Sequence, residues 1–295
     1  MFGKKTVTGT WFAAFCLFAA AALAQDYKIG VLANRDARTA VKEWKATADY
    51  LTSKVGKSFV IVPLDFDQLP EWTKEKKVDF VLTNSAFYAE LNRLYQVEAI
   101  ATLAKSFRDQ TTDQFGGVIL VKQDSPIKSL KDFKGKDFMC VKRSSFGGWL
   151  MAHRLFLESN IDPDKDFKSL RMGKTHDNVV YAVLNGAVEG GTVHTGILEK
   201  MIEEGKIKKE DFRIIAQVHD SFPLVHSTQL YPEWPIAACS TVPEPVKNQV
   251  VQLLLGLTGS DASLKDARIA GWRRVIDYTP VTECPRITHT EGFSD

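Results

Sequence analysis

The sequence lacks the short motifs by which many enzymes and metalloproteins are recognised. None of its four cysteines lies in a Cys-x-x-Cys pair, and its six histidines include no pair at i and i+4, so there is no zinc signature. It also has no Gly-x-Ser-x-Gly elbow, no P-loop and no Gly-x-Gly-x-x-Gly fingerprint. We therefore expect no catalytic residues, no metal and no cofactor, and a hydrolase has little support.

Net charge is nearly absent as well. The 295 residues include 38 Lys and Arg against 36 Asp and Glu, which gives a formal charge of +2. A nucleic-acid-binding protein would show a basic stripe and a high pI, so no nucleic-acid partner is expected. With 44% hydrophobic and 25% charged residues, the chain is a folded globular protein rather than a disordered one. Its length fits one large or two medium domains.

Only one long apolar run occurs, and it lies near the N-terminus. Lys4 and Lys5 precede the uncharged stretch Trp11–Ala24, which ends in a small-x-small pattern before Gln25. This arrangement is typical of a cleaved secretory signal, so residues 1–24 are predicted to be a signal peptide. The alternative is a membrane anchor, which is disfavoured because the 14 residues of the run fall short of the roughly 20 needed to cross a bilayer.

Export would place the protein in the periplasm and its cysteines in an oxidising compartment. Both excess positive charges belong to the predicted signal peptide, so residues 25–295 are formally neutral, and we predict that they are periplasmic. A lipoprotein modified at Cys16 is a weak alternative, because a bulky residue precedes that cysteine. Export permits one disulfide among the other three cysteines, but the sequence does not choose the pair. These three are Cys140, Cys239 and Cys284.

Short apolar strands alternate with amphipathic helices along residues 25–295, which is the pattern of an α/β fold with a parallel or mixed sheet. Two α/β units of about equal size emerge, the second inserted into the first, so the chain crosses between them twice. The predicted division is lobe I at 25–116 and 234–295, and lobe II at 117–233. A cleft between two such lobes is a favoured place for a small ligand, with hinged closure around it.

Open α/β sheets bind ligands beyond the carboxyl ends of their strands, and this rule selects candidate residues. In the first unit, polar residues follow the strands expected over Tyr27–Ala33 and Val78–Leu82. In the second unit, they follow the strands expected over Phe138–Val141 and Gly190–Val193, and the return crossing adds one serine. The candidate ligand-binding residues are Arg35, Asn84, Ser85, Tyr88, Arg143, Ser144, Ser145, Gly147, Gly148, His176, Asp177, His194, Thr195 and Ser227.

The run Arg143–Gly148 is the most informative of these segments. It places hydroxyls and glycines between a strand and the helix expected over Trp149–Ser159, so backbone N–H groups at the positive end of the helix dipole form a ready anion site. Two consecutive glycines there are unfavourable unless something approaches the backbone closely. The alternative is an ordinary capping turn, which Ser144 or Ser145 would satisfy alone.

Three further features stay open when they are judged from the residues alone. His176 begins an expected helix and either donates to a ligand oxygen or is a solvated N-terminal residue. His194 and Thr195 either contact the ligand or cap the helix that follows them. The run Tyr231–Pro235 either lines the cleft or stiffens the crossing between the lobes.

Several runs of residues resemble periplasmic solute-binding proteins with two crossovers. The segment Asp124–Lys136, the pair Asp79-Phe80 and the pair His176-Asp177 ahead of Ala182–Gly186 are similar to the phosphate- and phosphonate-binding (PhnD-like) branch. Other runs look closer to the periplasmic sensor region of tetrathionate-sensing histidine kinases and their relatives. These runs are Phe146–Gly148, Gly191–Glu199, His226–Pro235 and residues 271–281.

The resemblance implies a type II periplasmic binding protein fold, with two crossover strands and a ligand cleft between the lobes. It implies that Ser145, His176 and the turn around Gly147 contact an oxyanion. The segment Thr83–Ser85 and Tyr88 would face that oxyanion from the other lobe. The turn departs from the Ser-Thr-Ser-Gly run of phosphonate binders, so the ligand stays open between a phosphorus and a sulfur oxyanion.

The expected function is that of an exported solute-binding protein, not of an enzyme. It would capture a small oxyanion by hinge closure and pass it to the membrane permease of an ABC transporter. The alternative is a stand-alone periplasmic sensor component that presents its ligand state to a separate histidine kinase. Arg35 and Arg143 are expected to make charge-assisted contacts with the anion. We expect a monomer.

Overall fold

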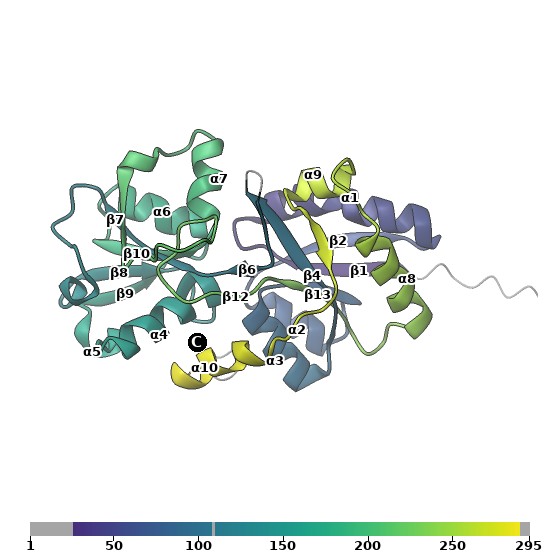
Figure 1. Cartoon of the computed structure of the whole chain (residues 1–295). Coiled ribbons are helices and arrows are strands. Elements are labelled where there is room, and N and C mark those ends of the chain that lie inside the picture. The colour runs from purple at the N-terminus through teal and green to yellow at the C-terminus, as the bar shows by residue number, and fades with distance from the viewer. Residues whose placement is uncertain (1–25, 108–109, 290–295) are drawn as a thin grey trace, which may run out of the picture.

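A computed structural model of the chain describes residues 26–107 and 110–289, which form two α/β lobes side by side (Figure 1). The predicted signal peptide and Cys16 lie outside these residues. Within the two described ranges, no helix combines the length and the apolar character that a membrane span requires.

The first lobe is built on a seven-stranded mixed sheet in the order β14-β4-β13-β3-β1-β2, with β5 paired to β4. β1, β2 and β3 run parallel, whereas β13 is antiparallel to both β3 and β4. The strands are β1 (Tyr27–Leu32), β2 (Phe59–Leu64), β3 (Phe80–Leu82), β4 (Glu98–Phe107), β5 (Gln110–Thr112), β13 (Pro235–Ala238) and β14 (Gly271–Arg273).

Helices cover both faces of this sheet. α1 packs against β2, α8 and α9, while α2 and α3 pack together below the sheet in the view of Figure 1. The α1 helix begins where the Asp36 side chain accepts a hydrogen bond from the Thr39 N–H, and it ends at Gly56 in the left-handed conformation. The helices are α1 (Ala37–Val55), α2 (Gln68–Lys74), α3 (Ser85–Tyr95), α8 (Glu244–Leu255) and α9 (Ala262–Ala267).

The second lobe has a five-stranded sheet in the order β11-β7-β10-β8-β9, in which β7 is antiparallel to both of its neighbours. Its strands are β7 (Gly117–Lys122), β8 (Asp137–Cys140), β9 (Ser169–Met172), β10 (Gly190–His194) and β11 (Phe212–Ile215). Its helices are α4 (Met151–Glu158), α5 (Pro163–Asp166), α6 (His176–Leu184) and α7 (Ile197–Glu203), with short 3₁₀ turns at η1 (Leu130–Phe133) and η3 (Lys209–Asp211) and a π-helical turn η2 (Phe146–Leu150) ahead of α4.

Two antiparallel segments join the lobes. β6 (Gln114–Phe115) pairs with β12 (Tyr231–Pro232) in a two-stranded ribbon between the large sheets (Figure 1). These segments lie where the sequence predicts the two crossings. The exact lobe boundaries at 116/117 and 233/234 stay a prediction of where the hinge bends.

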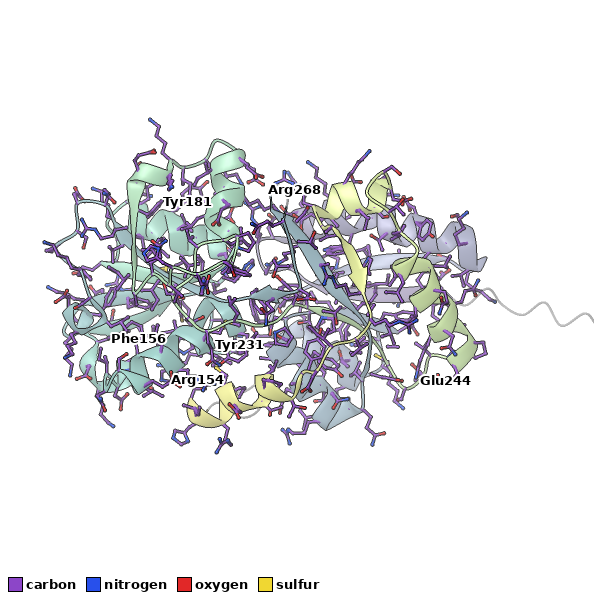
Figure 2. The ribbon with its side chains drawn as sticks, viewed as in Figure 1. Arg154, Phe156, Tyr181, Tyr231, Glu244 and Arg268 are labelled. Carbon is purple, nitrogen blue, oxygen red and sulfur yellow. The ribbon has the colours of Figure 1, made fainter. Side chains whose placement is uncertain are left out.

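The chain passes between the lobes a third time, which the sequence did not predict. After β14 it forms η4 (Thr279–Thr282) beside α3 and then α10 (Glu283–Ile287) against α4 of the second lobe (Figure 1). The Cys284 thiol donates to the Leu150 carbonyl at 3.3 Å. Arg154 of α4 donates to the Tyr231 hydroxyl at 2.9 Å, and Figure 2 shows these two side chains above α10. The C-terminal segment therefore ties the hinge side of both lobes together.

The predictions for the cysteines and for the start of one helix and one strand can be compared with the structure. Cys140, Cys239 and Cys284 are buried, and no disulfide joins any two of them. The helix expected from Trp149 begins three residues earlier, at Phe146, because the glycine turn is itself helical. The sequence pattern predicts a strand from Phe167 to Leu170, and β9 begins two residues later, at Ser169.

The contribution of the third crossing to the stability of the protein can be tested at Tyr278. The Tyr278 hydroxyl donates to the Glu233 carbonyl at 2.8 Å and lies 3.0 Å from the Thr102 hydroxyl, in a buried position. Tyr278→Phe should lower the free energy of unfolding by about 1–2 kcal/mol, because both buried partners lose a hydrogen bond. Urea unfolding measures this change. Tyr181→Phe on α6 is the control, and an equal effect of both substitutions would contradict the role of the crossing.

Candidate functional site

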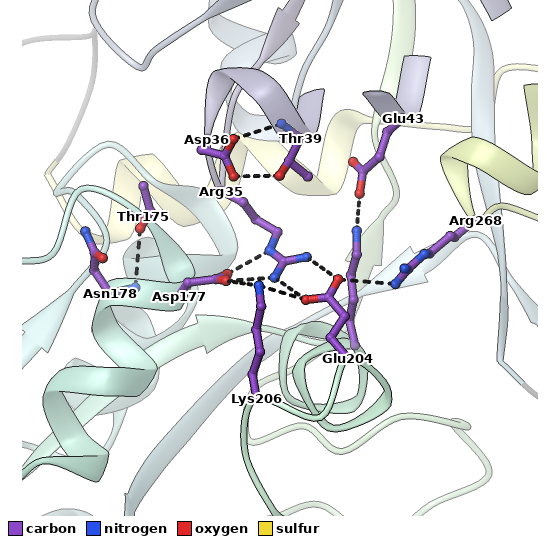
Figure 3. Close-up of polar contacts among 11 residues, drawn as sticks. Arg35, Asp36, Thr39, Glu43, Thr175, Asp177, Asn178, Glu204, Lys206 and Arg268 are labelled. Carbon is purple, nitrogen blue, oxygen red and sulfur yellow. Dashed lines mark hydrogen bonds and ion pairs between the residues drawn. The ribbon is translucent and has the colours of Figure 1, made fainter. Parts of the chain in front are cut away.

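One arginine joins the two lobes. Arg35 follows β1 of the first lobe, and its guanidinium donates to both carboxylate oxygens of Asp177 at 2.7 Å each. It also donates to Glu204 at 3.0 and 2.9 Å (Figure 3). Asp177 lies in the first turn of α6 and Glu204 follows α7, so both carboxylates belong to the second lobe. We call these three residues the latch.

The pKa shifts of the latch residues show that their charged forms stabilise the contact between the lobes. Burial alone would lower the pKa of Arg35, but its hydrogen bonds to the two carboxylates outweigh burial and raise it. The hydrogen bond from Arg35 lowers the pKa of Glu204 to about 2. A carboxyl with a lowered pKa stabilises the folded form above its ordinary pKa, and this contribution is lost as the pH falls through the lowered value. The latch therefore holds at neutral pH and fails between about pH 4 and pH 2.

Other contacts close the same cleft. Lys200 of α7 pairs with Glu43 of α1 (Figure 3), and the Lys142 ammonium pairs with Asp67. The Asn34 side-chain nitrogen lies 3.1 Å from Nε2 of His194. Each pair joins one lobe to the other, so the structure is that of the closed form.

A small cavity remains between the closed lobes. Its volume is about 10 Å³, which is space for roughly one water molecule. No carboxylate or cationic side chain lines it within the described chain. Its polar lining consists of Asn34, Asn84, Ser145, Gly147, His176 and His194. Its apolar lining consists of Leu32, Phe66, Phe115 and Trp234.

Three helices begin at this cavity. Asn84 is the N-cap of α3 and accepts a hydrogen bond from the Phe87 N–H at 3.0 Å. Ser145 precedes the helix formed by η2 and α4, and His176 is the first residue of α6. The first N–H groups of a helix have no partner within it, and its N-terminus carries about half a positive charge. The cavity therefore has a positive potential without a cationic side chain.

The partners of the two cavity histidines indicate which ring nitrogens carry protons. Nδ1 of His194 lies 2.5 Å from the Thr195 carbonyl, which only accepts, so Nδ1 is protonated and Nε2 accepts from Asn34. Nδ1 of His176 accepts from the His194 backbone N–H at 3.4 Å, so its Nε2 carries the proton. Among the described residues that Nε2–H has no acceptor. His194 therefore supports Asn34, whereas His176 is free to donate into the cavity.

Both imidazoles are neutral in this structure. Burial lowers the pKa of His176 to about 3 and that of His194 well below its usual range. Above about pH 6.5 these imidazoles are neutral in every form of the chain, so they make no pH-dependent contribution to its stability. Below that pH the open or unfolded form binds an extra proton that the closed form does not, so the stability of the closed form falls by about 1.4 kcal/mol per pH unit and per histidine as the pH drops toward the lowered pKa. Acid therefore opposes closure first through the histidines and then through the latch.

The glycine pair packs against protein atoms. A Cβ on Gly147 would lie 2.6 Å from Cβ of His194 and 3.1 Å from the Phe115 ring. A Cβ on Gly148 would lie 2.6 Å from Oγ of Ser145. The close approach predicted at these glycines is real, but it is made by the cavity wall itself.

A larger cavity of about 160 Å³ adjoins the small one. The two share Leu32, Asn34, His194 and Trp234. Its cations are engaged in ion pairs: Arg35 in the latch, Lys105 with Glu233 at 2.7 Å, Lys200 with Glu43, and Arg268 with Glu204 at 3.4 Å. This cavity is thus a mixed-charge chamber next to a neutral one.

The structure brings five of the predicted site residues to the small cavity. These are Asn84, Ser145, Gly147, His176 and His194. Arg35, His194 and Thr195 line the larger cavity, and Asp177 belongs to the latch.

The remaining predicted residues lie outside both cavity linings. Arg143 pairs with Asp164 at 2.7 Å, in a half-exposed position. The Ser227 hydroxyl donates to Ile215 and accepts from the Ile119 N–H, so it secures the crossing segment to β7 and β11. The Tyr88 hydroxyl accepts from the Ala99 N–H at 3.3 Å. Ser85, Ser144 and Gly148 are buried next to lining residues.

Five residues that line the small cavity were not among the predicted ligand contacts: Leu32, Asn34, Phe66, Phe115 and Trp234. Asn34 directly follows β1 and so satisfies the strand-end rule, although Arg35 beside it was chosen instead. Phe115 and Trp234 lie on the crossing segments, which the strand-end rule does not cover. Trp234 belongs to the run Tyr231–Pro235, for which lining the cleft was one of the two interpretations.

The packing of Gly147 can be tested directly. Gly147→Ala should lower the free energy of unfolding by about 1–3 kcal/mol and shift His194, because the new methyl group overlaps its side chain. Thermal unfolding and anion titration measure the two effects. Gly259→Ala is the control, because a Cβ there meets no atom within 4 Å. Wild-type stability in Gly147→Ala would contradict this account.

The latch can be tested without a ligand. Arg35→Lys keeps the positive charge but cannot bind two carboxylates in the same forked geometry. It should lower the free energy of unfolding by roughly 1–3 kcal/mol and raise the radius of gyration in small-angle X-ray scattering. Arg143→Lys, at a surface pair, should change neither. An unchanged radius of gyration in Arg35→Lys would show that closure does not depend on the latch.

Comparisons with known sequences place this chain among periplasmic binding proteins. Residues 29–279 match the family model described as the phosphonate ABC transporter periplasmic substrate-binding protein. Tetrathionate sensor histidine kinase TtrS of Salmonella typhimurium is 32% identical over 257 residues, which cover 86% of this chain. The chain spans only 43% of the length of that relative.

Solved structures show the same fold. PhnD1 from Prochlorococcus marinus, in complex with methylphosphonate, has a TM-score of 0.75 at 15% identity and covers 90% of this chain and 98% of its own. A binding protein component of an ABC phosphonate transporter from Pseudomonas aeruginosa has a TM-score of 0.75 at 18% identity, covering 90% and 86%. The fold is that of type II periplasmic binding proteins, and both family and fold are those of binding proteins, not of enzymes. The chain belongs to the family of periplasmic substrate-binding proteins of phosphonate ABC transporters.

Proposed function

We propose that this protein is an exported solute-binding protein that closes its lobes on a small oxyanion in the cavity between them. The observation that carries the proposal is the lining of the small cavity. Three helix N-termini begin there, and no carboxylate among the described residues faces it. Backbone N–H groups at helix N-termini bind anions in exchange for water.

The anion would be held by neutral donors. Nε2–H of His176 and the Ser145 hydroxyl come from the second lobe, and the Asn84 side-chain nitrogen comes from the first. A ligand bound by all three joins the lobes, so binding and closure are coupled. Arg35 acts on the ligand only indirectly, because its guanidinium is held by the two latch carboxylates.

The chemistry of the lining favours a sulfur oxyanion over a phosphorus one. Phosphate, phosphate monoesters and phosphonates keep a proton over part of the range around pH 6–7, and this proton needs an acceptor. Sulfate-like oxygens carry no proton and need donors only. Since no carboxylate among the described residues lines the small cavity to accept a proton, a fully ionised sulfur oxyanion is the better match. The name of the tetrathionate sensor relative agrees with this choice, and the name of the family supports the phosphorus alternative.

The same comparisons support two candidate partners. The family description supports delivery of the ligand to an ABC permease. A second candidate is a separate sensor kinase that reads the closed form, which the similarity to the periplasmic part of a tetrathionate sensor favours. In both cases the protein acts in the periplasm as a monomer, and the closed form is the signal that the partner recognises.

A thermal-shift panel tests the proposed ligand. Residues 25–295 would be mixed with tetrathionate, thiosulfate, sulfate, phosphate or methylphosphonate at constant ionic strength. An anion at about 100 times its Kd adds about 2.7 kcal/mol of stability, which is roughly 5–10 °C in Tm for a protein of this size. We expect this shift with at least one sulfur oxyanion.

Two histidine variants localise the effect. His176→Phe keeps a ring but removes the free Nε2–H, so the affinity for the responding anion should fall at least tenfold. His153→Phe is the matched control, because His153 is also buried and has its pKa lowered to about 4 by burial, yet it lines neither cavity. No shift with any anion would contradict the proposed function. An equal response of both variants would remove His176 from the site.

A further inference from the structure

Trp234 occupies the junction between the hinge and the two cavities. It lies between β12 and β13 on the return crossing, and its carbonyl accepts from the Leu103 N–H at 3.0 Å. The side chain is 8% exposed, and it lines both the small and the large cavity. It is therefore fixed in the wall that the two cavities share.

The indole nitrogen of Trp234 is an unused donor. It is buried and has no hydrogen-bond partner among the described residues. An indole nitrogen only donates, so just an acceptor can satisfy it. A buried donor without an acceptor costs free energy, and such a group in a native structure calls for an explanation.

The unused donor belongs to a residue that lines both cavities, and other buried donors are neighbours in sequence of a residue in the cavity wall. The Ser85 and Thr83 hydroxyls, next to the lining residue Asn84, are also buried without a partner in the part of the chain that the structure describes. The small cavity holds only one water-sized group, so its walls must separate slightly to admit an oxyanion of four or more heavy atoms. That movement opens the buried donors of the wall to the oxygens of the ligand.

We propose that Trp234 is a ligand-binding residue, whose indole N–H donates to an oxygen of the bound oxyanion at the boundary between the two cavities. This inference rests on the proposed function and adds a donor from the hinge to those from the two lobes. A ligand held at this boundary extends from the neutral cavity into the mixed-charge chamber. Without a ligand, the closed form loses free energy of stabilisation because this buried donor has no acceptor. With a ligand bound, the donor has an acceptor, so the ligand favours closure.

A second buried tryptophan provides a matched control. The Trp272 indole nitrogen is also buried without a partner among the described residues, and the side chain is 7% exposed, but it lines neither cavity. Replacing either residue by Phe removes an unsatisfied indole donor and keeps an aromatic ring. Only Trp234→Phe should change the affinity for an anion.

The experiment is isothermal titration of the wild type and both variants with tetrathionate, thiosulfate, sulfate, phosphate and methylphosphonate. We expect Trp234→Phe to weaken the binding of the responding anion about ten- to hundredfold, while Trp272→Phe binds as the wild type does. Equal binding by wild type and Trp234→Phe overturns this inference and leaves the proposed function intact. Failure of the wild type to bind any of the five anions overturns both.

A measurement on the wild-type side chain covers the case in which Trp234→Phe does not fold. In protein labelled with ¹⁵N-tryptophan, the indole N–H signal of Trp234, assigned by elimination with Phe variants at the other tryptophans, should move downfield as the responding anion is added. Its exchange with water should also slow. A signal that moves no more than that of Trp272 overturns the inference.

Discussion

One guanidinium makes the most hydrogen bonds between the two lobes among the described residues. Arg35 is almost fully buried and joins Asp177 and Glu204 across the cleft, over 142 and 169 residues of sequence. Its planar fork binds both carboxylates at once, which a lysine ammonium cannot do in the same geometry. Because Arg35 is held by the two carboxylates and no cationic side chain among the described residues lines the small cavity, the proposed recognition of an anion falls to helix N-termini and neutral donors.

A neutral binding site has consequences for selectivity. A cationic side chain attracts any anion, whereas N–H and O–H groups in fixed positions bind tightly only an anion whose oxygens lie within hydrogen-bond distance of them. The neutral imidazole of His176 fits this arrangement, since it offers one donor at Nε2 while the His194 backbone N–H engages its other nitrogen. Desolvation, which lowers the pKa of His176 to about 3, keeps that donor neutral over the physiological range.

The sequence predicted the parts of the site that follow from local rules. Ser145 and His176 begin helices after β8 and β9, which are neighbours in the second-lobe sheet, and the carboxyl ends of such strands meet at one edge, so their convergence was predictable. Asn84 follows β3 of the other sheet, and it joins them because the predicted cleft lies between the two lobes. The partners of Arg35 were not predictable, because an ion pair between residues far apart in the chain leaves no periodic pattern. Arg35 and Arg143 looked alike in sequence, yet one is buried in the latch and the other pairs at the surface. Likewise, no repeat or cap predicted that α10, a helix of five residues, would cross to α4.

Opposing free energies around the empty cavity explain how a ligand can control closure. The latch and the Lys200–Glu43 pair favour the closed form, whereas the buried donors without partners and the desolvated histidines oppose it. In the proposed function an oxyanion adds acceptors for those donors, so it shifts the balance by its differential affinity for the closed form. Specificity then lies in the cavity and the strength of closure lies in the latch. Because different residues carry the two properties, the ligand preference of this fold can change while its closing movement, which a partner at the membrane would recognise, stays the same.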